Sequence, residues 1–269
     1  MIFEYRVPIS GCVAVKKWAK QWKDLEALRG ETYNAALEAI TVQVTEAGTN
    51  PSQRPNQSSL GQIRTNAFLN ESPDLAPWEM REFRLVSTTL PGPSLPFAGR
   101  LFEDTVKQTP DLSFNGTTAL AGYANANSAA ILLNAHVVPE SLSGQPFLAG
   151  YAPLPGNGAV ASAVPQFFWN GPAITTSSVR HHLSLNTCNG CHGQETGTVF
   201  MHVDPFGTLS RFLTGTGPRG VPDPADKFVF HRFNDLARRR QALEEILTAS
   251  CFPKYALTDV FFQPLHMTH

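Results

Sequence analysis

Glycine and proline limit what this chain can fold into. The 269 residues include 20 glycines and 21 prolines, and both residue types interrupt regular structure and favour turns. The sequence therefore predicts a fold that is rich in turns and loops. The length is enough for one large domain or two modest ones, and either arrangement can bury a substantial core.

Two helices are predicted near the start of the chain. Residues 13–29 place Trp18 and Trp22 on one helical stripe, and Gly30 is a plausible end for this helix. Residues 32–47 repeat the spacing. Two tryptophans at helical spacing belong more often to a core than to a binding platform, so we expect both to pack inside.

Alternating apolar and polar residues predict two strands, at residues 3–8 and 81–87. A further apolar run, at residues 127–139, is too short for its periodicity to distinguish a helix from a strand. Turn-forming residues predict loops in three stretches, at residues 48–62, 91–98 and 143–173.

The clearest amphipathic helix covers residues 233–247, with a cap at Asn234 or Asp235. It contains the one basic run, Arg238–Arg240, which we interpret as a solvated helix face. The net charge of the chain is −1. Nothing therefore drives it electrostatically toward nucleic acid or an anionic membrane.

Together these elements predict an α+β fold. We expect a single loop-rich domain over residues 1–269, with amphipathic helices packed on a small, mostly antiparallel sheet and a soft division near residues 106–126. No apolar segment approaches the ~20 residues that cross a bilayer, and no signal peptide is visible. Met1 is therefore expected to lie inside a longer gene product whose leader is missing upstream.

Four cysteines bear on function: Cys12, Cys188, Cys191 and Cys251. From the residues alone, Cys12 and Cys251 are either two buried thiols or a disulfide. A bridge between them would close nearly the whole chain and would stabilise the fold by roughly 4–5 kcal/mol. It would also indicate an oxidising compartment.

Cys188, Cys191 and His192 form a C-x-x-C-H motif, the pattern of a c-type haem attachment site. Two thiols at this spacing can reach the two vinyl groups of one porphyrin edge, and the adjoining histidine can bind the iron. Gly190 and Gly193 remove side-chain bulk next to the macrocycle. The candidates for the sixth iron ligand are Met201, His202, His181 and His182, or the position stays open.

A non-haem metal site is the second interpretation of the same residues. Two thiolates with one or two imidazoles satisfy tetrahedral zinc, and the candidate ligands are Cys188, Cys191, His181, His182, His192 and His202. With an open position, zinc would activate a water molecule. Glu195 or Asp204 could then act as general base, which suits the hydrolysis of a small ester or lactone.

The third interpretation is non-enzymatic. Cys188 and Cys191 could form a small disulfide in a binding or envelope protein that has no cofactor. The three interpretations stay open on the residues alone. So do the oligomeric state and the identity of a small-molecule ligand or redox partner.

The chain resembles a family of exported bacterial proteins, often lipoproteins, that has no assigned activity. The resemblance covers most of the chain and rests on five blocks: GQIRTNAF (61–68), WEMREFRL (78–85), RHHLSLNTCNGCHGQET (180–196), SRFLTGT (210–216) and FNDLARR (233–239).

The resemblance implies a periplasmic or cell-surface location, and it favours both a Cys12–Cys251 bridge and haem attachment. It also draws attention to four polar residues that are hard to explain as packing. We expect a buried ion-pair network rather than a pocket lining for these residues, which are Arg64, Asn66, Arg81 and Glu82.

Overall fold

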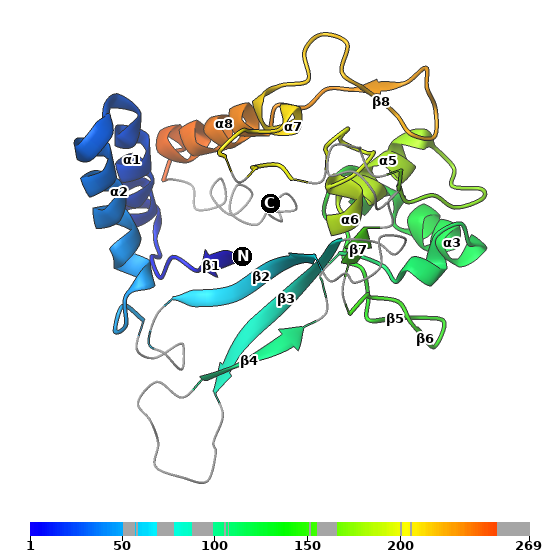
Figure 1. Ribbon diagram of the computed structural model, residues 1–269, viewed down its shortest axis with the longest axis horizontal. Coiled ribbons are helices and arrows are strands. Elements are labelled where there is room, and N and C mark those ends of the chain that lie inside the picture. Colours follow the sequence, from blue (N-terminus) through cyan, green and yellow to red (C-terminus); the bar gives the residue numbers. More distant parts are fainter. Residues whose placement is uncertain are drawn as a thin grey trace. The chain divides into compact units, whose positions relative to one another are not determined.

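A computed structural model shows an α+β fold, as predicted, with helices and small antiparallel sheets (Figure 1). The structure describes residues 1–50, 57, 59–68, 78–87, 99–104, 106, 108–150, 152–154, 166–199, 201–204 and 206–251. The predicted loop at 91–98 lies outside these residues, as do parts of the predicted loops at 48–62 and 143–173.

The chain divides into two compact units that interleave along the sequence. The first unit comprises Met1–Thr65, Glu82–Asp104 and Arg240–Phe262, and the second comprises Asn66–Arg81, Thr105–Arg239 and Gln263–His269. One boundary falls just before the soft division expected near residues 106–126. The single domain over residues 1–269 stays a prediction.

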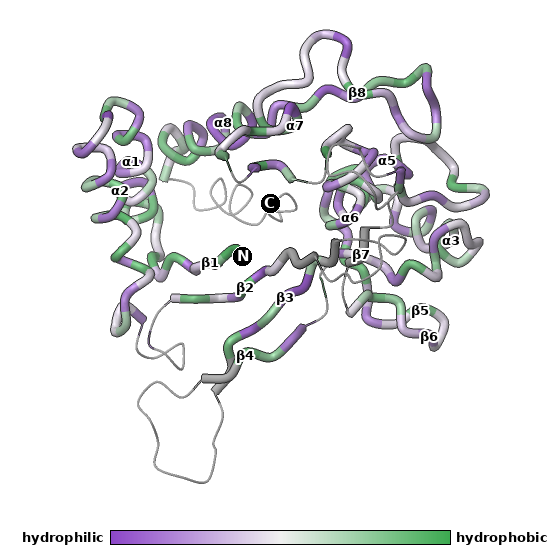
Figure 2. The backbone as a smooth tube through the Cα atoms, in the orientation of Figure 1, coloured by the Kyte–Doolittle hydropathy of each residue, from purple (hydrophilic) through white to green (hydrophobic). Residues whose placement is uncertain are grey.

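Two packed helices open the first unit, α1 (Cys12–Asp24) and α2 (Gly30–Thr45), with a 3₁₀ turn η1 (Leu25–Ala27) between them. Hydrophilic and hydrophobic residues alternate along both helices, as expected for amphipathic segments (Figure 2). Trp18 and Trp22 are half-buried and lie edge to face, with their ring centroids 5.6 Å apart. Both helices therefore confirm the predictions from periodicity.

The last described helix, α8 (Asp235–Thr248), confirms the amphipathic helix predicted at 233–247. The Asn234 side chain accepts a hydrogen bond from the backbone N–H of Ala237 at 3.0 Å, so Asn234 is the capping residue. Asp235 is instead buried and paired with two arginines that follow it in the helix.

A disulfide joins Cys12, at the start of α1, to Cys251, just after α8, with the two Cα atoms 5.6 Å apart. This resolves the alternative that the residues alone left open. Beside the bridge, the Lys16 ammonium donates to the carbonyl of Ala249 at 2.7 Å. Three long-range contacts in the first unit therefore tie α1 to the end of the described chain, the third being the ion pair of Lys23 with Glu244.

The main sheet has the order β1-β2-β3-β4, with β7 also paired to β3, and its described registers are antiparallel. β1 ends at Tyr5, earlier than the strand predicted at 3–8, and its register with β2 shifts between Glu4 and Tyr5. The strands are β1 (Ile2–Tyr5), β2 (Leu60–Phe68), β3 (Trp78–Ser87), β4 (Gly99–Asp104) and β7 (Ala152–Leu154).

An ion-pair network links three strands of this sheet in the first unit. Arg64 Nε lies 2.9 Å from Glu4 Oε1 and 3.1 Å from Glu82 Oε1, and Glu82 is buried. The network predicted for Arg64 and Glu82 is therefore confirmed. Asn66 lies in β2 and its side chain is outside the described residues, whereas Arg81 is half-buried in β3.

The second unit is built around short helices and two small hairpins. Its apolar core is formed largely by α3 and α5, with Phe147 and Trp169 fully buried between loops. The ambiguous run at 127–139 contains one short helix and otherwise no regular structure. The elements are η2 (Leu112–Phe114), α3 (Thr118–Ala126), α4 (Ser128–Leu132), β5 (Ser141–Leu142), β6 (Gln145–Pro146), α5 (Ser177–Leu185), α6 (Cys188–Cys191), α7 (Arg211–Thr214), β8 (Val221–Pro222) and β9 (Phe230–His231).

Across the residues that the structure describes, no helix is both long enough and apolar enough to cross a membrane.

Candidate metal centre

Two threonine caps shape the segment that presents the candidate site. The Thr176 hydroxyl accepts the backbone N–H of Val179 at 3.2 Å and starts α5. The Thr187 hydroxyl accepts the N–H of Gly190 at 3.0 Å and starts α6. Such caps satisfy backbone donors that have no partner inside the helix. The C-x-x-C sequence thus forms one helical turn, directly after the helix that contains His181.

Four buried or half-buried side chains of the second unit meet: His181, Glu195, Asp223 and His231. Each offers one ligand atom, and all four atoms lie within 4.8 Å of one another. His181 Nδ1 is 2.5 Å from Glu195 Oε1, and His231 Nε2 is 2.8 Å from Asp223 Oδ2. These residues, referred to below as the four-ligand group, come from α5, the loop after α6, and the β8–β9 hairpin.

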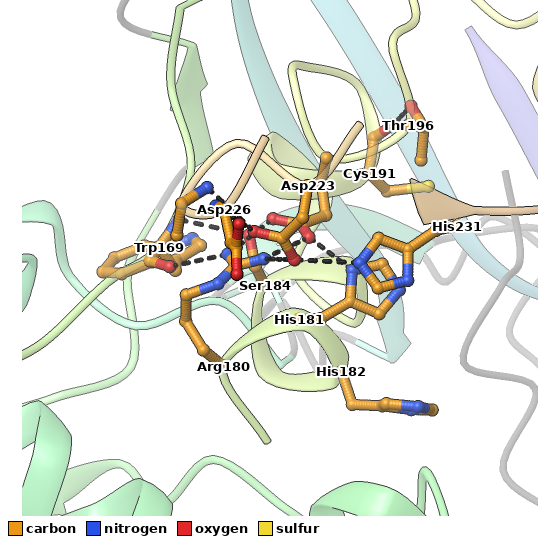
Figure 3. Close-up of polar contacts among 12 residues, drawn as sticks. Trp169, Arg180, His181, His182, Ser184, Cys191, Thr196, Asp223, Asp226 and His231 are labelled. Atoms are coloured by element: carbon orange, nitrogen blue, oxygen red, sulfur yellow. Dashed lines mark hydrogen bonds and ion pairs between the residues drawn. The ribbon is translucent and has the colours of Figure 1, made fainter. Parts of the chain in front are cut away.

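The two imidazole rings of this group lie face to face. The ring centroids of His181 and His231 are 3.4 Å apart and the planes differ by 2° (Figure 3). The stack brings both histidines beside the two carboxylates. The face-to-face arrangement and the two short imidazole–carboxylate contacts leave these side chains little freedom to rotate.

Arg180 lies against the same carboxylates. Its Nη2 donates to Glu195 Oε1 and to Asp223 Oδ2, each at 2.7 Å. Its Nη1 donates to Glu195 Oε2 at 2.8 Å and to the carbonyl of Trp169 at 3.2 Å. A guanidinium that bridges two buried carboxylates offsets most of their mutual repulsion.

Both carboxylates are held in the ionised form. Burial by itself raises the pKa of Glu195, but hydrogen bonds from Arg180 and His181 outweigh it and leave the pKa below its ordinary value. The pKa of Asp223 is also lowered, because contacts with His231 and Arg180 outweigh the effect of burial. Two ionised carboxylates therefore face a single guanidinium at this centre.

The donor set is chemically suited to a first-row transition metal. Imidazole nitrogens and carboxylate oxygens bind Zn²⁺, Fe²⁺ and Mn²⁺. A metal ion bound among these atoms would replace the two short imidazole–carboxylate contacts. The four-ligand group could therefore hold a metal ion, as the sequence predicted in general. Of its four residues, only His181 was among the predicted ligands. Glu195 was predicted as a general base, and Asp223 and His231 were not predicted as site residues.

The cysteine-containing zinc site stays a prediction, and the described residues do not place its ligands in one close group. Among the described residues, the four-ligand group is the one set of three or more potential ligands that lie this close, and it contains no cysteine. The sulfurs instead pack in separate apolar clusters. Cys188 lies with Met80 and Val106, and Cys191 lies with Phe212 and neighbouring leucines.

Cys188 and Cys191 are both thiols, 6% and 1% exposed, so the disulfide between them that we considered is not formed. Burial, with a smaller effect from Cys188, raises the pKa of Cys191 well above its ordinary value. A thiol with a raised pKa is a poor nucleophile. Cys191 is therefore a buried thiol with little thiolate character in the folded protein.

His202 lies beside Cys191. Its Nε2 is 3.6 Å from Cys191 Sγ, and its Nδ1 is 3.0 Å from the hydroxyl of Ser210. The ring centroids of His192 and His202 are 4.6 Å apart. The structure thus brings His202 and His192 to the cysteine turn, although not into the four-ligand group.

The remaining predicted site residues lie elsewhere in the second unit. His182 Nδ1 is 3.0 Å from Asn134 Oδ1, and its ring points away from Asp223 although it lies edge to face with the His181 ring (Figure 3). Asp204 accepts the N–H groups of Phe206 and Thr208, each at 2.8 Å, and so stabilises a turn. Met201 packs against the apolar cluster of Cys188. Of the two predicted general bases, Glu195 belongs to the four-ligand group and Asp204 does not.

Comparison of the whole chain with protein-family models, with curated proteins and with solved structures gives no match.

Proposed function

We propose that this protein binds one divalent transition-metal ion, with zinc as the first choice, at His181, Glu195, Asp223 and His231. The observation that supports the proposal is the convergence of four ligand atoms that lie within 4.8 Å of one another, two of them from carboxylates. The Cys12–Cys251 disulfide supports a periplasmic or cell-surface location, where disulfides persist.

The geometry requires only small movements to accept zinc. A tetrahedral ion with bonds of about 2.0–2.2 Å places neighbouring ligand atoms roughly 3.3–3.6 Å apart. The His181–Glu195 and His231–Asp223 pairs, now at 2.5 and 2.8 Å, would widen as the ion replaces each contact. Arg180 can keep its contacts, because each carboxylate oxygen accepts more than one partner.

Four protein ligands fill a tetrahedral ion and leave no position for a water molecule. The proposal is therefore for a structural metal in a binding protein, in preference to a hydrolase of small esters or lactones. Glu195 would be a ligand in this proposal, so it would not serve as a general base.

Zinc titration of metal-stripped full-length protein tests the proposal. We expect one zinc ion per chain by calorimetry and by elemental analysis. The variant His231→Asn should weaken binding by about 100-fold or more, because it removes one of four ligands. His182→Asn is the matched control, since His182 follows a ligand in sequence but lies outside the group, and it should bind as the wild type does. Binding that survives in His231→Asn, or sub-stoichiometric zinc in the wild type, would refute the assignment.

A second candidate function is covalent haem attachment at Cys188 and Cys191, with His192 as an axial ligand, in a protein that exchanges electrons with a redox partner. One observation favours it: these two cysteines remain thiols on a single helical turn, in a chain that forms a disulfide elsewhere. The chemistry that haem would supply is one-electron transfer. Met201 and His202, near Cys188 and Cys191 respectively, are the described candidates for the second axial position.

Export of the chain to the periplasm of a host with haem-maturation machinery tests this candidate. We expect a Soret band and a mass increase of one haem, both lost in Cys188→Ser/Cys191→Ser. A colourless exported wild-type protein whose mass equals that of the polypeptide would rule it out.

A further inference from the structure

Two members of the four-ligand group, His181 and Glu195, flank the cysteine turn in sequence. His181 and Glu195 are 14 positions apart in sequence, and their side chains meet at 2.5 Å. The whole C-x-x-C-H motif lies between them. The contact therefore closes a short loop, and that loop contains Cys188, Cys191 and His192.

Contacts outside the group tie the same loop to it. The Trp169 indole donates to Asn189 Oδ1, between the two cysteines, at 2.8 Å. The Trp169 carbonyl in turn accepts from Arg180, which binds both carboxylates. On the other side, the Thr196 hydroxyl donates to the carbonyl of Cys191 at 2.5 Å, one residue after Glu195.

From this arrangement we propose that a metal ion in the four-ligand group controls chemical access to Cys188 and Cys191. The proposal rests on the metal-binding function proposed above. Reagents can reach the two buried thiols only when the loop opens, and an opening that separates His181 from Glu195 must release the ion. At a free metal concentration of 100 times the Kd, such openings become about 100-fold rarer.

The consequence is that the rate at which these cysteines react depends on whether the metal is bound. Without the ion, the loop is held by hydrogen bonds, the Arg180–Glu195 ion pair and apolar packing, and when it opens both sulfurs are exposed to a modifying group or an oxidant. With the ion, the thiols are protected although the metal touches neither of them. The four-ligand group would then act as a clamp on a modification site.

The test compares alkylation of the two thiols by iodoacetamide in metal-stripped and zinc-loaded full-length protein, followed by mass spectrometry of the peptides. We expect about 100-fold slower alkylation with zinc, and the same protection in His182→Asn. In His231→Asn, the same zinc concentration should give little protection. If zinc binds one to one and the rates are equal, the clamp is wrong and the metal site stands; if zinc does not bind, both proposals fail.

Two further measurements distinguish the clamp from two other causes of protection, which are direct binding of the metal by the thiolates and global unfolding of the metal-stripped protein. Cobalt bound in place of zinc should show no sulfur-to-cobalt charge-transfer absorption, because no thiolate is a ligand; such a band would overturn the proposal. Hydrogen exchange in α2 should be the same in both metal states. Loss of protection throughout α2 in the stripped protein would indicate global unfolding and would also overturn it.

Discussion

Position 190 leaves no room for a side chain. A Cβ at Gly190 would clash with the carbonyl oxygen of Ser184 and with the hydroxyl of Thr187. The haem interpretation links this glycine to space beside a porphyrin. The structure gives it a local role as well, since it allows α6 to pack against the end of α5. The tight turn that presents the cysteines depends on it.

We therefore expect Gly190→Ala to destabilise the protein by about 1–3 kcal/mol, because the backbone must shift to relieve the overlap. Urea unfolding monitored by circular dichroism measures this. Gly122→Ala is the control: position 122 is exposed in α3 and has open space around it, so alanine should be neutral or stabilise by about 0.5–1 kcal/mol. Equal stability of the two variants would show that the Gly190 turn is not tight.

His202 makes stability depend on pH. Burial, with a smaller effect from His192, lowers its pKa from 6.5 to about 3 in the folded protein. Between these values the unfolded chain binds a proton that the folded chain does not. The stability that comes from keeping His202 neutral is therefore fully present above pH 7. As the pH drops below 6.5, the free energy of unfolding falls by about 1.4 kcal/mol per pH unit.

Free energies of unfolding at pH 7, 6 and 5 check this. The slope should be smaller in His202→Gln, which can still accept a hydrogen bond but does not titrate here. Parallel pH profiles of wild type and variant would mean that His202 is as easily protonated in the folded state as in the unfolded one.

Residue-level prediction from the sequence succeeded where residues are close in the chain. The C-x-x-C-H motif was recognised from its spacing, and His181 and Glu195 lie within the same block. Asp223 and His231 could not be found in that way. They reach the site because the β8–β9 hairpin folds back onto α5, and no spacing pattern in the sequence records that contact.

At the scale of elements, length decided which predictions succeeded. Helices α1, α2 and α8 are long enough for their apolar periodicity to be recognised, and all three were predicted. The helices around the site are short: α6 has four residues and α7 has four. A single turn gives no periodicity, and it forms because caps such as Thr187 and tertiary packing hold it.

The strands were likewise predictable only where they are long enough to show alternation. β3 was predicted because its apolar and polar residues alternate over several positions. The hairpins β5–β6 and β8–β9 have strands of two residues each, so alternation cannot identify them. The β8–β9 hairpin supplies one ligand at each end of its turn, so the element most needed for the site was the least visible in the sequence.

At the scale of the whole molecule, the Cys12–Cys251 disulfide is the strongest single constraint. It spans a sequence separation of 239 residues. Because it limits the unfolded chain so widely, we expect Cys12→Ser/Cys251→Ser to lower the free energy of unfolding by about 5 kcal/mol. Denaturant midpoints measure the loss. A reductant should have the same effect on the wild type and none on the variant, and a midpoint that reduction leaves unchanged would contradict the prediction.

The position of this bridge also bears on how the protein is made. During synthesis Cys12 emerges first, Cys188 and Cys191 follow, and the correct partner comes last. Between the synthesis of Cys188 and that of Cys251, the other sulfurs available to the first cysteine are the wrong ones. Early folding of the segment around α5 and α6 would bury those two competitors, so the native pairing depends on the middle of the chain being finished before its ends are joined.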